Sequence, residues 1–116
     1  MTSTLAVERI DLRAGDSLPG FAAVIEDHNG VAANLADSLC YLQVIKNGVM
    51  VENECTIANP TTATVTYDWT GTEIRLWGVG THELRVRVLW NNGDALIAPA
   101  DRSCLLVIKP EIASLL

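Results

Sequence analysis

The stretch ELRVRVLW, residues 83–90, decides the fold class of this chain. Every second residue in it is apolar, and three of the four residues between them are charged. A period of two places alternate side chains on opposite faces of a β-strand, so the stretch predicts a strand with one apolar and one polar face. The segment TVTYDW, residues 64–69, alternates in the same way. The apolar row of the first strand is Leu84, Val86, Val88 and Trp90.

Short segments rich in β-branched and aromatic residues flank these two strands. Turn residues separate the segments at intervals typical of β-sandwiches, and a capped amphipathic helix is not evident. We therefore expect one all-β domain over residues 1–116, an antiparallel β-sandwich of seven to eight strands. The segment GTEIRLWG, residues 71–78, is expected to hold at most a brief 3₁₀ turn. The further strands are expected at residues 5–12, 21–27, 39–46, 49–57, 95–98 and 104–109.

Three Asn-Gly pairs mark candidate hairpin turns, at residues 29–30, 47–48 and 92–93. Asparagine and glycine adopt positive φ at low steric cost, which a type I′ turn requires at both central positions. The sequence therefore predicts three type I′ hairpins.

The letters GDSL at residues 15–18 also head a large family of esterases and lipases. A serine nucleophile needs a base within hydrogen-bond reach and a group that orients this base. The last 34 residues contain no histidine, and Val79 stands where an aspartate would precede His82. We therefore interpret Ser17 as a turn hydroxyl and expect Leu18 to close one end of the core. The chain is not expected to be an enzyme.

Composition excludes several other classes of function. The net charge of −6, with −5 in residues 1–58, disfavours binding to nucleic acid, which requires a basic surface. Apolar runs are far shorter than the ~20 residues that span a membrane, and a signal peptide is not evident. The three cysteines, an odd number, are expected as small buried residues and not as disulfides.

Metal and cofactor sites are not expected either. His28 and His82 have no second histidine or cysteine at ligand spacing. Glu26, Asp27 and Asp37 could form an acidic patch, and a weak cation site there is a minor alternative. No cofactor is predicted.

Aromatic and arginine residues are the first candidates for contacts with a partner. Trp69 and Trp90 end apolar rows and are expected in the core, whereas Trp77 lies outside clear alternation and is a candidate interface residue. Arg85 and Arg87 form the solvated row of their strand, or pair with the acidic half of a neighbouring copy.

The two ends of the chain are candidate arms, residues 1–9 and 110–116. Segments of this kind can order on a partner, or they can simply fray. Their apolar residues, all candidate contacts, are Leu5, Val7, Ile112, Leu115 and Leu116.

The order of the motifs resembles the immunoglobulin-like N-terminal domain of siphophage baseplate upper proteins. RAGDSLP is similar to that family's Gly-Asp turn, VIEDHNG to its Asp-x-x-Gly hairpin, and NLADSLCYLQVI to its next strand. TVTYDWT resembles its Tyr-x-Trp strand, and WGVGTHELRVRVLWNNGDALIAP and LLVIKPEI its last segments. The resemblance covers about residues 10–112, with His82 where the family usually has tyrosine.

The resemblance implies a non-enzymatic bacteriophage virion protein with an immunoglobulin-like fold, made in the bacterial host cytoplasm. The expected role is a tail, baseplate or fibre-attachment adaptor that docks onto other virion proteins and forms a homo-oligomer in the particle. A head cement or decoration protein is one alternative. A carbohydrate- or receptor-binding module is another, with Trp77 and Tyr41 as its available aromatics.

Overall fold

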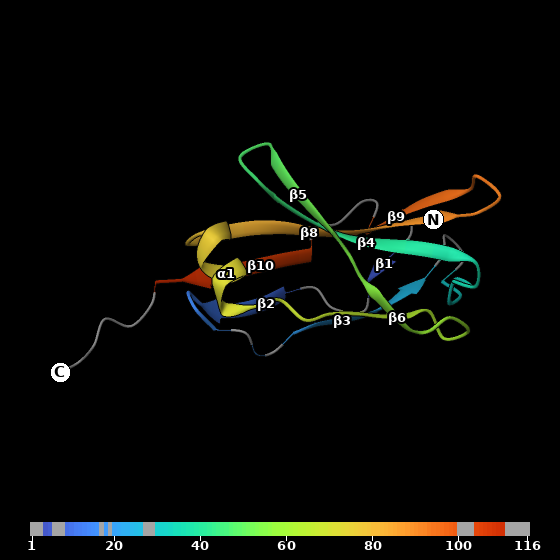
Figure 1. Cartoon of the computed structure of the whole chain (residues 1–116), viewed down its shortest axis with the longest axis horizontal. Coiled ribbons are helices and arrows are strands. Elements are labelled where there is room, and N and C mark those ends of the chain that lie inside the picture. The colour runs from blue at the N-terminus through green and yellow to red at the C-terminus, as the bar shows by residue number, and fades with distance from the viewer. Residues whose placement is uncertain are drawn as a thin grey trace.

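The computed structural model describes residues 4–5, 9–16, 18, 20–26, 30–99 and 104–110. In these ranges the chain forms two packed β-sheets and one short helix, as Figure 1 shows. The expected all-β sandwich is confirmed. The described residues contain ten strands, more than the seven to eight expected, because two expected strands are each divided between the sheets.

The smaller sheet has four strands and the larger has six. The four-stranded sheet has the order β1 (Thr4–Leu5), β3 (Phe21–Glu26), β7 (Thr64–Tyr67) and β6 (Thr56–Asn59). The six-stranded sheet has the order β2 (Arg9–Arg13), β10 (Cys104–Lys109), β8 (Gly80–Trp90), β4 (Ser38–Lys46) and β5 (Val49–Glu54). Its sixth strand, β9 (Ala95–Ala98), lies on the same side of β8 as β10. It pairs with residues 86–89 of β8, whereas β10 pairs with residues 80–84.

One strand pair departs from the expected antiparallel arrangement. β2 and β10 run parallel, with Arg9 opposite Leu105 and Arg13 opposite Lys109. The other pairs in both sheets are antiparallel. A parallel pair needs a long connection between its strands, and here nearly the whole chain lies between them.

The two divided strands change sheets at short breaks. The segment expected as one strand at 49–57 becomes β5 and β6, and the break falls on Cys55. Cys55 is buried, and its N–H donates to the Cys40 carbonyl at 2.7 Å. The segment expected at 5–12 becomes β1 and β2, so Thr4–Leu5 pairs with Ile25 and Glu26 of the smaller sheet.

The core forms between the sheets from the alternating rows that the sequence indicates. Leu84, Val86 and Val88 of β8 are fully buried, as expected. Trp69 is also buried and contacts the Phe21 ring. Trp90 is half-buried, and its indole N–H donates to the Asn34 carbonyl at 2.9 Å. The three cysteines are buried and free, which confirms that expectation.

The expected 3₁₀ turn is an α-helix, α1 (Gly71–Trp77). Thr70 and Glu73 form a capping box: the Thr70 hydroxyl accepts from the Glu73 N–H, and the Glu73 carboxylate accepts from the Thr70 N–H. This satisfies two N–H groups that a helix start leaves free. Gly71 lies against the Gly15 carbonyl, and a side chain there would collide with it.

The turns follow expectation only in part. Asn47 and Gly48 both have positive φ, as a type I′ hairpin requires. At residues 92–93 only Gly93 does, and the Trp90 N–H bonds to the Asp94 carbonyl, so the expected I′ turn is replaced by a longer loop. Asn29 lies outside the described residues.

The GDSL segment forms a turn around Asp16, as far as the structure describes it. The Asp16 carboxylate accepts from the Arg13 N–H at 3.1 Å, and its own N–H donates to the Arg13 carbonyl. The expectation for Leu18 is wrong: the residue is 80% exposed and does not belong to the core. Ser17 lies outside the described residues.

Candidate docking site

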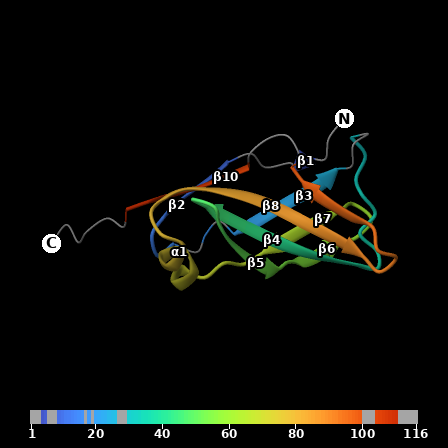
Figure 2. The same ribbon diagram turned by 90° about the horizontal axis from the view of Figure 1, so that it is seen from above.

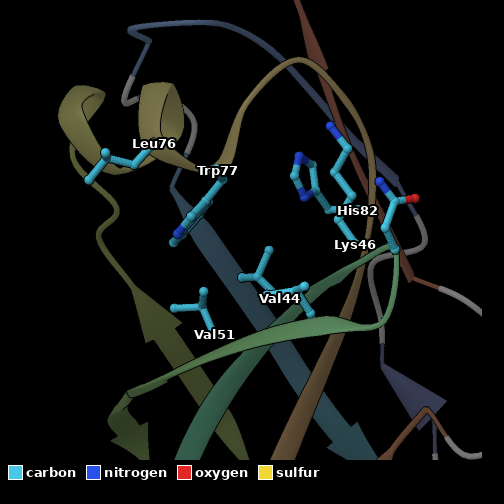
Figure 3. Close-up of a pocket in the computed structure, with 8 residues that line it drawn as sticks. Val44, Lys46, Val51, Leu76, Trp77 and His82 are labelled. Carbon is cyan, nitrogen blue, oxygen red and sulfur yellow. The ribbon is translucent and has the colours of Figure 1, made fainter.

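An apolar hollow opens between the β4–β5 hairpin, helix α1 and the start of β8 (Figure 3). Its volume is about 340 Å³, which is at the small end of the range for ligand pockets, roughly 300–1,000 Å³. The residues that line it are Val44, Lys46, Asn47, Val49, Val51, Leu76, Trp77 and His82.

The hairpin register explains why these side chains converge. Val44 lies opposite Val51 and Lys46 opposite Val49, so all four point to one face of the sheet. That face is the inner one, because Val44 is buried in the core. After β5 the chain crosses to the smaller sheet as β6. At the end of the hairpin near its turn, helix α1 is the element that faces this inner surface across the hollow. The inner face of β5 is therefore only partly covered.

Trp77 forms the wall on the helix side. Its ring meets the buried Trp69 ring edge-on, with centroids 6.1 Å apart. Figure 3 shows the indole near Val44 and Val51, with Lys46 and His82 across the hollow. This fixed aromatic wall gives the hollow a defined shape.

The opposite wall carries the polar groups. His82 is 2% exposed, and its Nε2 donates to the Gly78 carbonyl at 2.8 Å. Burial lowers the pKa of His82, so the ring is neutral at pH 7. Lys46 Nζ donates to the Val79 carbonyl at 2.5 Å. Gly80, with φ of 132°, leaves the space that the lysine ammonium fills.

Lys46 gives the hollow a positive charge. Among the described residues, the ion pairs involve other partners, and none joins a carboxylate to Lys46. The described residues that line the hollow include no acid, serine or cysteine. The hollow therefore suits an apolar group accompanied by a negative charge.

The rim of the hollow is unusually apolar for a protein surface. Val49 is 67% exposed, Met50 51% and Leu76 79%. Val51 and Val79 are also exposed. β5 is the edge strand of its sheet, so this rim adjoins an unpaired backbone edge. Met50 projects to the opposite face of β5, whereas Val49, Val51 and Leu76 line the hollow. We call Val49, Val51 and Leu76, with the hollow they line, the apolar rim.

Trp77 is the sequence-predicted contact residue that the structure places at this site. Leu5 lies in β1, in the smaller sheet. Val7, Ile112, Leu115 and Leu116 lie outside the described residues.

Arg85 and Arg87 lie on the opposite, outer face of the six-stranded sheet. Arg87 forms two hydrogen bonds of 2.8 Å with the Glu52 carboxylate and lies over the Tyr41 ring, 5.0 Å from its centroid. These bonds from Arg87, with a further one from Gln43, lower the pKa of Glu52. Arg85 pairs with Glu83 at 3.3 Å. Arg87 therefore has an acidic partner within its own chain.

Sequence reasoning did not single out the rest of the apolar rim. The signal available was the run Val49-Met50-Val51, which directly follows a turn and breaks the apolar–polar alternation of an edge strand. Leu76 gives no such signal, because a two-turn helix can bury either side.

Other classes of site are not evident in the described ranges. Within them no group of three His, Cys, Asp or Glu side chains could hold a metal ion. The helix that the structure describes is too short to cross a lipid bilayer.

The chain matches no known protein-family profile and no curated protein. It is similar to several solved structures, two of which illustrate the range. One is the N-terminal domain of phage TP901-1 ORF48, with 17% identity and a TM-score of 0.59, over 86% of this chain and 83% of that one. The other is CopC from Methylosinus trichosporium OB3b, with 15% identity and a TM-score of 0.56, over 96% and 97%. At these identities the similarity establishes the shared fold.

Proposed function

We propose that this chain is a non-enzymatic structural component of a bacteriophage particle, which acts by docking onto other virion proteins. Two independent similarities support a phage origin. The order of its sequence motifs resembles the baseplate upper family, and its fold is similar to a domain of a phage protein over 86% of the chain. Because CopC has a similar fold, the fold alone does not decide the function.

The apolar rim is the observation that carries the docking role. Val49 and Val51 lie there on an edge strand and Leu76 on the facing helix, with more than half of Val49 and Leu76 exposed. Proteins usually protect such edges with charges or bulges, and contiguous exposed apolar patches mark sites of protein contact. The first three residues of β5, Val49 to Val51, carry no charge, and two of them line the hollow.

The chemistry of the hollow supports binding over catalysis. His82 is neutral and donates to the Gly78 carbonyl, and the lining residues that the structure describes offer no nucleophile beside it. Within the particle, we infer, this domain is a tail, baseplate or fibre-attachment adaptor. Its mechanism is geometric: a shaped apolar surface is repeated by the symmetry of the virion.

Purified particles from the phage or prophage that carries the gene test this proposal. We expect mass spectrometry to find the chain at a fixed ratio to the major tail protein after gradient purification. Gold-labelled antibody should then mark the tail tip, whereas labelling over the capsid would favour the head cement alternative. A chain abundant in the lysate and absent from the particles would overturn the virion role.

A glycan array tests the carbohydrate alternative with the purified chain. We expect no binding, because Tyr41 is covered by Arg87 and Trp77 packs edge-on against Trp69. Saturable binding of a glycan that Trp77→Ala abolishes would favour a receptor-binding module instead.

A further inference from the structure

The hollow and the end of β10 lie at the same end of the sandwich. Ile108, near the end of β10, pairs with Gly80, and Gly80 adjoins the Lys46 ammonium in the wall of the hollow. Figure 2 shows α1 and the end of β10 at this same end. Pro110, the residue after β10, therefore lies at the same end of the sandwich as the apolar rim, and the sequence continues from it with Glu-Ile-Ala-Ser-Leu-Leu.

We propose that residues 111–116 of a second copy occupy this hollow, and that two copies exchange these segments about a two-fold axis. From the proposed function the inference takes only the premise that the apolar rim is a docking site. The partner that it names for that site is a second copy of this chain.

The chemistry of the segment matches the chemistry of the hollow. Ile112, Leu115 and Leu116 are aliphatic, as are Val44, Val49, Val51 and Leu76 of the walls. The one charged residue of the segment is Glu111, and among the described residues that line the hollow the charged one is Lys46. Lys46 uses one of its three N–H donors for the Val79 carbonyl, so it retains donors for a carboxylate. In an extended conformation, Ile112 and Leu116 would project to the same side.

Geometry favours a second copy over the same chain as the source of the segment. Proline keeps the residue before it extended, so Lys109 and Pro110 direct the chain onward from the end of β10. To enter its own hollow the segment would have to reverse at once and pass β8 to reach β4 and β5. Since donor and acceptor lie at one end of the molecule, two copies that meet end to end can each supply what the other accepts. Such an isologous contact closes as a dimer.

The neighbouring residues of β5 provide a matched pair of variants. Val49 projects into the hollow, and Met50 projects to the opposite face of the sheet, with similar exposure. Val49→Glu places a charge in the acceptor site, and Met50→Glu places the same charge just outside it. Deletion of residues 111–116 removes the donor. Thermal unfolding of each variant checks that it remains folded.

Sedimentation of the full chain gives the first result. We expect a monomer–dimer equilibrium for the unmodified chain and for Met50→Glu. For Val49→Glu and for the deletion we expect a dissociation constant at least about tenfold higher, since each removes apolar contact from the interface. An equimolar mixture of these two variants should form a heterodimer, because one retains the donor and the other the acceptor. A monomeric unmodified chain, or a deletion variant that still dimerises, would overturn the proposal.

A synthetic peptide of residues 110–116, PEIASLL, tests the contact directly. Titrated into the deletion variant labelled with ¹⁵N, it should shift the amide signals of Lys46, Val49 and Val51 in a saturable manner. The peptide with Glu111→Gln should bind about 2–5-fold more weakly, the usual size of an exposed ion pair. Shifts that are absent, or that map to another face, would refute the exchange. Neither experiment depends on finding the chain in particles, so the virion role can fail or stand separately.

Discussion

Replacement of Ile74 by alanine measures how far helix α1 depends on its one buried side chain. Ile74 is 0% exposed, and it is the buried residue of the helix. The change removes three buried carbon atoms, worth about 2.4 kcal/mol at about 0.8 kcal/mol each. The cavity left behind adds about 1 kcal/mol, and the better helix propensity of alanine returns about 0.4 kcal/mol. We therefore expect a loss of about 3 kcal/mol in the free energy of unfolding.

Leu76→Ala is the matched control for this measurement. Leucine and isoleucine are isomers, both positions lie on α1, and Leu76 is 79% exposed. We expect its substitution to change the free energy of unfolding by no more than about 0.5 kcal/mol.

Urea unfolding followed by tryptophan fluorescence and by circular dichroism provides both values. For 116 residues, a loss of about 3 kcal/mol corresponds to a fall of about 12 °C in Tm. Equal losses for the two variants, or a loss below about 1 kcal/mol for Ile74→Ala, would refute the placement of α1 against the core.

Three further predictions concern groups that the structure buries or caps. Burial lowers the pKa of His82 in the folded chain, so the unfolded chain binds more protons below about pH 6.5. Stability should therefore fall as the pH falls through this range in acid titrations of the urea midpoint, and His82→Gln should flatten that dependence. Thr70→Ala removes the N-cap and should cost about 1 kcal/mol by urea unfolding, while a loss near zero would contradict the capping box. Burial raises the pKa of Cys40, and it raises the pKa of Cys55 to about 12. Both thiols should therefore react far more slowly with a disulfide reagent at pH 8 in the native chain than in the denatured chain. Fast reaction of either thiol in the native chain would contradict its burial.

The strands of the core could be predicted from the sequence because their side chains alternate. In β8, the apolar row at Leu84, Val86 and Val88 identifies both the strand and its buried face. Alternation says nothing about which sheet a strand joins. The crossing at Cys55 and the separation of β1 from β2 therefore appear only in three dimensions, and so does the parallel pair of β2 and β10.

The short helix escaped prediction for a different reason. Its seven residues are too few for a periodic pattern, and its stability comes from the Thr70 cap and the burial of Ile74. The docking site was predicted only through Trp77. Val49, Val51 and Lys46 belong to the site because the hairpin register places them on one face of the larger sheet. The smaller sheet leaves this part of that face only partly covered. The hollow therefore results from the packing of the two sheets and not from any sequence motif.

The parallel alignment of β2 with β10 has a mechanical consequence. Strand β2 begins at Arg9 and β10 finishes at Lys109, at opposite ends of the paired stretch. A pull applied to the chain at those two points would slide one strand along its neighbour, with all five residue pairs from Arg9–Leu105 to Arg13–Lys109 under shear at the same moment. Bonds strained in unison yield at a higher force than bonds peeled apart in turn. For a pull at these two points, the strand pair should therefore resist separation more strongly than a pair of the same length that is peeled from one end.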